Sequence, residues 1–220
     1  MYILGIDDAG RGPLIGPMIL AGVLVTTEQE KRLKTLGAKD SKLLAHSSRV
    51  AISKEILKNS ISSKVVQSSP EEIDNSINSG TNLNTLEAKK AAEIINSLNN
   101  KKDKIKVIVD CPSVNTQVWQ RTLERFIDYL DNLKISCEHK ADANHPSVSA
   151  ASILAKVRRE EEVSRLKKEF GNFGSGYPSD PLTKLFLRER GNELENSGLF
   201  RKTWATWKNI FPDNKQKTLF

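Results

Sequence analysis

The chain has 220 residues, in which 34 Lys and Arg outnumber 27 Asp and Glu, so its formal net charge is +7. A chain of this length buries roughly 70 to 75% of its unfolded surface, which predicts one domain with a substantial core. Two cysteines are too few for a disulfide framework and no apolar run is long enough for a membrane span, so we expect free thiols and a soluble, cytoplasmic protein. The basic excess indicates a polyanionic partner, unless the charge is incidental.

The first predicted element is a short apolar strand at residues 2–6, with the composition of a strand that is buried on both faces. It runs into Asp7 and Asp8, and a Gly-Arg-Gly sequence follows. Successive side chains of a regular strand point to opposite faces, so both acids can serve one site only if the pleat breaks there. Gly10 and Gly12 would permit that break, because glycine adopts backbone angles that other residues avoid. The alternative is that an acid caps a turn and the glycines form a loop.

Strands and helices alternate along the rest of the chain. We predict strands at 18–26 (antiparallel to the first), 61–67, 105–109 and 134–138. We predict helices at 28–36, 48–58, 118–130 and 147–170. Two more begin at caps: one starts at Ser69 and ends before Gly80, and the next starts at a capping box of Asn84 and Glu87. A last helix is expected around Trp204 and Trp207. Trp119 and Phe126 are expected in the core.

This alternation predicts an α/β layer architecture with a central sheet. We expect residues 1–190 to form the main domain, residues 191–212 to form a helical extension packed on it, and residues 213–220 to form a flexible tail.

Four acids lie at or just after the carboxyl ends of predicted strands, where α/β sheets bind their ligands. They are Asp7, Asp8, Asp110 and Asp142. Carboxylates that converge raise one another's pKa unless cations compensate them. Oxygen ligands favour Mg²⁺ or Mn²⁺ over zinc, and His46, His139 and His145 lack zinc-ligand spacing. Two such ions can activate a water and stabilise the leaving oxygen of a phosphodiester.

Several segments together resemble the type 2 ribonucleases H, in the order found in that family and over residues 3 to about 207. They are Gly5-Ile-Asp-Asp-Ala-Gly-Arg-Gly-Pro13, Asp40-Ser-Lys-Leu43, Val109-Asp110, Lys140-Ala-Asp142, Ser149-Ala-Ala-Ser-Ile-Leu-Ala-Lys156 and Gly174-Ser-Gly-Tyr-Pro-Ser-Asp180. The chain looks like the archaeal single-chain branch, except that Asp8 replaces the family's glutamate. The resemblance implies a ribonuclease H-like mixed central sheet flanked by helices, with a C-terminal helical extension.

By the same resemblance, the four acids are the catalytic ligands of two divalent ions. Gly10, Arg11 and Gly12 match the motif that contacts nucleotides around the scissile phosphate, and Tyr177 matches the tyrosine that recognises the ribonucleotide 2′-hydroxyl. Lys42 matches a position near the site, where it could contact a phosphate. The implied enzyme is a monomer that cuts the RNA strand of RNA–DNA hybrids. It also cuts 5′ of a single ribonucleotide in duplex DNA, leaving 3′-hydroxyl and 5′-phosphate ends.

Two alternatives remain at this point. One is a hybrid-binding protein without activity, because Asp8 is one methylene shorter than the family's glutamate. The other is an actin-like phosphotransferase, for which the chain is too short. Separately, residues 216–220, from Gln216 to Phe220, resemble the start of a sliding-clamp binding motif, and the alternative is a frayed basic terminus.

Overall fold

Strand β1 is the middle strand of a five-stranded sheet whose order is β3-β2-β1-β4-β5. The computed structural model describes residues 1–35 and 45–212, so the predicted loop with Lys42 and the predicted tail at 213–220 lie outside the described residues. The strands are β1 (Tyr2–Ala9), β2 (Met18–Thr26), β3 (Ser62–Ser68), β4 (Ile105–Asp110) and β5 (Leu133–Glu138). The helices are α1 (Thr27–Thr35), α2 (His46–Asn59), α3 (Pro70–Asn78), α4 (Leu83–Leu98), α5 (Thr116–Glu124), α6 (Ala141–Asn144), α7 (Pro146–Phe170), α8 (Pro181–Arg190) and α9 (Ala205–Ile210).

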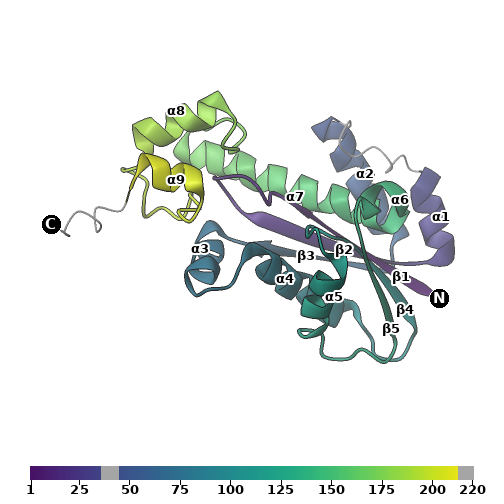
Figure 1. Ribbon diagram of the computed structural model, residues 1–220. Helices are drawn as coiled ribbons and strands as arrows, with labels where there is room; N and C mark the ends of the chain where they lie inside the picture. Colours follow the sequence, from purple (N-terminus) through teal and green to yellow (C-terminus); the bar gives the residue numbers. More distant parts are fainter. Residues whose placement is uncertain (36–44, 213–220) are drawn as a thin grey trace.

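The apolar sequence of β1 is explained by helices on both faces of the sheet (Figure 1). Leu4 and Ile6 point into a core shared with α4 and α5, whereas Ile3 points into a second core shared with α7. Gly5 lets α7 approach closely, because a Cβ at this position would lie 2.2 Å from the carbonyl carbon of Ser147. The start of α7 is thereby pressed against the strand that carries the first two acids.

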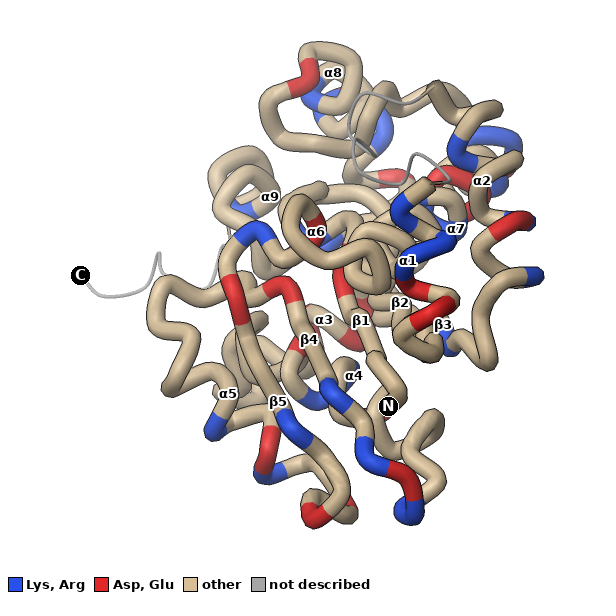
Figure 2. Tube along the Cα trace, turned by 90° about the vertical axis from the view of Figure 1, so that its right-hand side faces the viewer, with Lys and Arg blue, Asp and Glu red and all other residues tan. Residues whose placement is uncertain are grey.

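The pairing confirms a mixed sheet. β1 is antiparallel to β2 and parallel to β4, and β4 is parallel to β5. Figure 2 shows that acids of β4 and β5 lie at the ends of the strands near α6, whereas basic residues lie toward their starts. The carboxyl ends of β1, β4 and β5 therefore share one edge of the molecule.

The expected break in β1 at the two acids is wrong. The ladder with β2 continues in regular register through Asp7, Asp8 and Ala9, which face Ala21, Leu20 and Ile19. Gly10 has φ +84°, so the chain turns only after the strand has ended.

Two helix boundaries also differ from the predictions. The cap of α4 is Asn82, whose side chain accepts a hydrogen bond of 2.9 Å from the Thr85 N–H, and not Asn84. Helix α5 ends at Glu124, so Leu130 is exposed rather than part of a helical core stripe, and Val118 is exposed as well. Trp119 is buried in the core as predicted.

Helices α6 and α8 were not predicted. The start of α8 had a readable signal, since Asp180 caps it and Pro181 occupies its first position.

The C-terminal part of the described chain packs on the loop after β1. Leu14 and Ile15 of that loop share an apolar cluster with Phe200 and Trp207. Asp74 of α3 anchors the same segment, because its carboxylate accepts hydrogen bonds from the backbone N–H groups of Lys202 and Thr203 at 2.6 and 2.9 Å. The predicted final helix and its core role are confirmed.

The two cysteines, Cys111 and Cys137, are free and buried, as expected. Among the described residues, no helix combines the length and apolar character needed to cross a membrane.

Candidate active site

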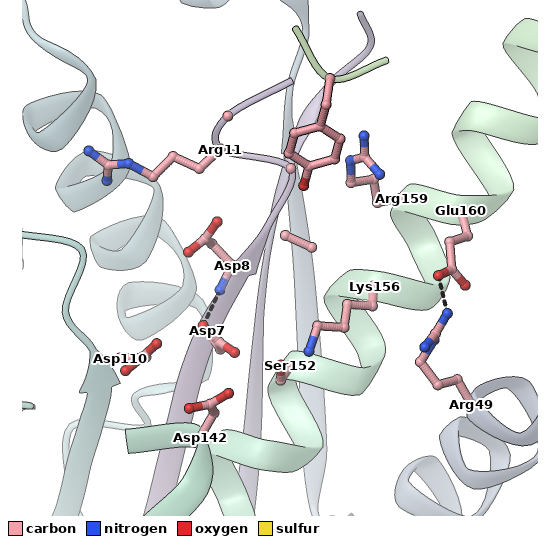
Figure 3. Close-up of a pocket in the computed structure, with 14 residues that line it drawn as sticks. Asp7, Asp8, Arg11, Arg49, Asp110, Asp142, Ser152, Lys156, Arg159 and Glu160 are labelled. Carbon is pink, nitrogen blue, oxygen red and sulfur yellow. Dashed lines mark hydrogen bonds and ion pairs between the residues drawn. The ribbon is translucent and has the colours of Figure 1, made fainter. Parts of the chain in front are cut away.

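A cavity of about 470 Å³ opens at the carboxyl ends of β1 and β4 (Figure 3). Its walls combine acidic, basic and glycine residues from β1 and the loop after it, from β4, α2, α6 and α7, and from the loop before α8. All described residues that the sequence singled out line this one cavity. They are Asp7, Asp8, Gly10, Arg11, Gly12, Asp110, Asp142 and Tyr177.

Asp7 and Asp8 reach the cavity although they lie on opposite faces of an unbroken strand. Asp7 faces α7, where it lies close to Ser152, whereas Asp8 faces α4. The pairing of β1 with β4 stops at Ile6 and Val109, so beyond that point the edge of β1 is open. An opening at a strand edge can be lined from both faces, and no break in the pleat is required.

Asp110, the third acid, is hydrogen-bonded to the turn that carries the fourth. It is the last residue of β4, and its Oδ1 accepts a hydrogen bond of 2.8 Å from the Ala141 N–H at the first residue of α6. Asp142 lies in that same turn. The turn is preceded by Lys140 in the left-handed region, with φ 56°. Figure 3 shows the carboxyl groups of Asp7, Asp110 and Asp142 turned toward a common space.

Burial and mutual repulsion shape the electrostatics of these acids. Burial, followed by the charge of Asp8, raises the pKa of Asp7 well above its ordinary value. Burial also raises the pKa of Asp8, although the nearby Arg11 guanidinium opposes this effect. The positive charges of the protein therefore do not fully offset the negative charges of these two carboxylates when they are ionised.

This donor set fits hard divalent cations. It consists of carboxylate oxygens, the ligands that Mg²⁺ and Mn²⁺ prefer, and a bound cation would offset the repulsion. In residues 1–35 and 45–212, no three His, Cys, Asp or Glu side chains already surround one point as metal ligands would. His46 and His145 instead pair with Glu160 and Glu138.

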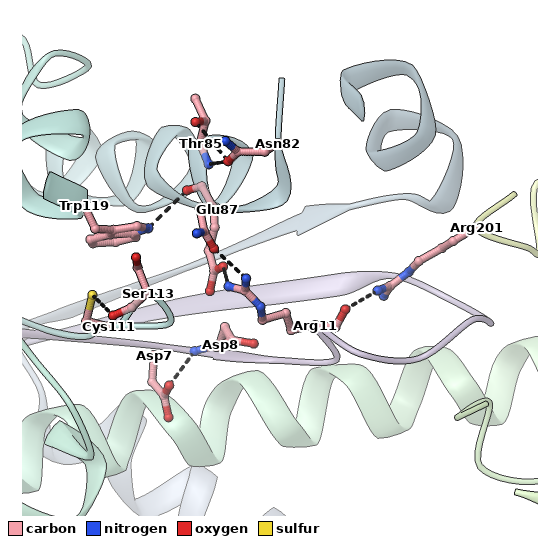
Figure 4. A network of polar contacts seen from close by, with 11 residues as sticks. Asp7, Asp8, Arg11, Asn82, Thr85, Glu87, Cys111, Ser113, Trp119 and Arg201 are labelled. Atoms are coloured by element: carbon pink, nitrogen blue, oxygen red, sulfur yellow. Dashed lines mark hydrogen bonds and ion pairs between the residues drawn. The ribbon is translucent and has the colours of Figure 1, made fainter. Parts of the chain in front are cut away.

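The backbone of residues 10–12 is held from the far end of the chain (Figure 4). Arg201, fully buried, donates hydrogen bonds of 2.6 Å to the Gly10 carbonyl and 2.7 Å to the Arg11 carbonyl. The indole N–H of Trp204 donates to the Gly12 carbonyl at 3.2 Å. Burial lowers the pKa of Arg201 to about 9, so its guanidinium is still cationic at neutral pH. Three successive carbonyls are thereby fixed in one orientation.

The Arg11 side chain leaves this loop toward α4. Its guanidinium is ion-paired with Glu87 and also donates a hydrogen bond of 2.5 Å to the Asn84 side-chain oxygen (Figure 4). Arg11 thus lines the cavity while its charged end is bound to the neighbouring helix.

Tyr177 lies on the opposite side of the glycine loop. A Cβ at Gly12 would be 3.6 Å from its ring, and the Arg159 guanidinium lies 5.3 Å from the ring centroid. The Gly176 carbonyl accepts hydrogen bonds from the Leu14 and Ile15 N–H groups at 2.8 and 3.2 Å. The tyrosine and the glycine loop are therefore parts of one hydrogen-bonded unit.

Comparison with known proteins identifies the family. A family model described as Ribonuclease HII matches residues 4–207. The chain belongs to the ribonuclease HII family. It is 46% identical over 218 residues to the Ribonuclease HII of Pyrococcus furiosus, with 99% of this chain and 94% of that protein covered. As a member of this family it is a ribonuclease H endonuclease, and the actin-like alternative is wrong.

Solved structures agree with this assignment. The ribonuclease H2 from Pyrococcus horikoshii OT3 aligns with a TM-score of 0.86 at 36% identity, covering 96% of this chain and 97% of that one. The ribonuclease HII in the PCNA:RNase HII complex from Archaeoglobus fulgidus aligns with a TM-score of 0.81 at 39% identity, covering 93% and 95%. The ribonuclease H-like fold expected from the sequence is confirmed.

The cavity of this ribonuclease HII also contains residues that sequence reasoning did not assign. Ser152 and Lys156 are four positions apart on α7, so they share one face of the helix, and both belong to a segment that carried the resemblance. Arg49 and Arg159 add positive charge to the same wall. Glu87 was expected only in a capping box with Asn84, and its pair with Arg11, 76 positions away, had no local signal.

Proposed function

We propose that this ribonuclease HII hydrolyses the RNA strand of RNA–DNA hybrids and cuts 5′ of single ribonucleotides in duplex DNA, with two divalent ions, Mg²⁺ or Mn²⁺. The products would carry 3′-hydroxyl and 5′-phosphate ends. The observation that supports this most is that Asp7, Asp8, Asp110 and Asp142 line one cavity together with Tyr177. The family uses divalent metals, which agrees with the oxygen donor set.

The four aspartates would hold the ions, and each has a distinct support. Asp7 and Asp8 are fixed by the register of β1, and Asp110 by the end of β4. Asp142 depends on α6, whose first N–H is bound by Asp110. The chemistry supplied by the bound ions is activation of the attacking water and stabilisation of charge on the leaving oxygen.

Discrimination between RNA and DNA would come from Tyr177. It is 40% exposed and lies beside the glycine loop, so its hydroxyl is available to a sugar at the cavity mouth. The 2′-hydroxyl is the group that distinguishes the two nucleic acids. Lys156 and Arg159 on α7 would meet the phosphate backbone, which supplies most of the affinity but no sequence information.

The test uses three duplexes of equal length: an all-RNA strand on DNA, DNA with one ribonucleotide, and DNA alone. Each is incubated with Mg²⁺ or Mn²⁺ and the cut is mapped by end chemistry. We expect cleavage of the first two only. The Asp110→Asn variant should lose nearly all turnover and keep hybrid binding, because it removes charge from a metal ligand and leaves packing intact. Unchanged turnover of Asp110→Asn, or binding without cleavage by the wild type, would overturn the proposal.

We also propose that residues 216–220 bind the replication clamp. These residues lie outside the described part of the chain, and the support is the motif, together with the PCNA complex of the Archaeoglobus fulgidus relative. Apolar anchors of a short tail can dock in a groove with modest affinity, on the order of micromolar. Calorimetry should show binding by the full chain and none after deletion of the five residues, with cleavage of short duplexes unchanged. No heat at tens of micromolar clamp would refute this role.

A further inference from the structure

The Arg11 guanidinium lies between two acids and is bound to one of them. It forms an ion pair with Glu87 and a hydrogen bond with the Asn84 side chain. It also lies near Asp8, which lines the same cavity. Glu87 also lies next to Asp8. The three side chains form one cluster at the edge of the cavity (Figure 4).

Glu87 is placed for this contact by the start of α4. Its side chain is only 3% exposed, whereas that of Arg11 is 32% exposed. The turn before Glu87 is fixed twice, because Asn82 caps the helix and the Asn84 carbonyl accepts a hydrogen bond of 3.1 Å from the Trp119 indole N–H. A carboxylate is seldom kept at this depth unless it is paired, and here its cationic partner is Arg11.

Without Glu87, the guanidinium would have a different partner available. Asp8 lies beside Arg11 in the same cavity, and an Arg–carboxylate pair is a strong, often bidentate contact. Such a pair would occupy the oxygens of Asp8 and cancel its charge. Both effects oppose the binding of a divalent cation by Asp8.

We infer that Glu87 is a positioning residue that withholds the Arg11 guanidinium from Asp8 and so leaves Asp8 able to bind a divalent cation. The inference rests on the proposed metal-dependent function and adds to it a residue outside the ligand set. Asn84 supports Glu87 in this role, since it binds the other terminal nitrogen of Arg11.

The test measures Mn²⁺ affinity by calorimetry on the full chain without nucleic acid, and the Mn²⁺ concentration that gives half-maximal cleavage. Glu87→Gln keeps the shape of the side chain and removes its charge, and we expect both measurements to show about tenfold weaker binding of Mn²⁺. Asn84→Ala changes no charge, and should weaken Mn²⁺ binding in the same direction by a smaller factor. The matched control is Glu93→Gln, which removes a half-exposed acid from the same helix and should change the affinity less than twofold.

The same substitutions in an Arg11→Gln background separate two explanations. If Glu87 acts by holding Arg11, Glu87→Gln should change Mn²⁺ affinity less than twofold in that background. Equal losses in both backgrounds would mean that Glu87 contributes only negative potential, and the inference would be overturned. Unchanged affinity in both Glu87→Gln and Asn84→Ala would overturn it too. Absence of Mn²⁺ binding by the wild type would refute the proposed metal site itself, which is a different failure.

Discussion

Replacing Arg201 with Ala should destabilise the protein and disable the glycine loop together. The guanidinium is fully buried and donates three hydrogen bonds, of 2.6, 2.7 and 3.0 Å, to the carbonyls of Gly10, Arg11 and Gly16. Hydrogen bonds from charged donors contribute about 1.5–3 kcal/mol each, but they are not additive, and the cost of burying the charge offsets part of the gain. We therefore expect a net loss of about 3–5 kcal/mol in the free energy of unfolding.

Calorimetry and denaturant titration measure this loss directly. For a chain of this size it corresponds to a fall of roughly 10 °C in melting temperature. Cleavage should fall at temperatures where the variant is still folded, because the loop that carries Gly10 has lost its support. The control is Lys202→Ala, the adjacent residue, whose side chain is 39% exposed and whose backbone bond to Asp74 is retained. A loss below about 1 kcal/mol for Arg201→Ala, or an equal loss for the control, would refute the reasoning.

Three further substitutions test the cavity. The pKa of Asp7 is raised in the folded state, so protonated Asp7 favours the folded protein. This contribution to the free energy of unfolding is fully present below the unfolded pKa and is lost as the pH rises through the folded pKa. Asp7→Asn should therefore raise the melting temperature of the metal-free protein at neutral pH while abolishing cleavage, and a lower melting temperature would contradict the burial argument. Asp8→Glu should keep or raise activity by restoring the family's longer reach, whereas inactivation would show that the site is built around the shorter acid. Tyr177→Ala should reduce cleavage at a single ribonucleotide more than affinity for plain duplex DNA, measured by fluorescence anisotropy, and equal losses would mean that Tyr177 only packs.

The sequence predicted those parts of the fold and site that depend on local pattern. The apolar run of β1, the acid at the end of β4 and the cap at Ser69 are each legible within a few residues, and all three are present. The convergence of the acids could be expected from strand ends alone. The break expected in β1 was wrong because the pattern of one strand does not show where its pairing with a neighbouring strand ends. The cavity depends on the neighbouring strand, whose pairing stops at Val109.

Contacts across the chain were not predictable in this way. Arg201 binds the Arg11 carbonyl 190 positions away, and an Arg that is followed directly by Lys202 has no local pattern that indicates burial. Glu87 was interpreted as half of a capping box with Asn84, because its ion pair with Arg11 joins segments that are far apart in the sequence. Such residues become visible only when the topology brings distant segments together.

The bonds between the glycine loop and residues 199–204 also bear on synthesis of the chain. A ribosome adds Asp7 and Asp8 about 190 residues before it adds the donors that fix the loop beside them. Contacts of such long sequence separation form late in folding. During translation the growing chain therefore holds its first acids before their loop is supported, and the loop can be fixed only after residues 199–204 have emerged. The cleavage site is in this way completed by residues that are synthesised about 190 positions after its first acids.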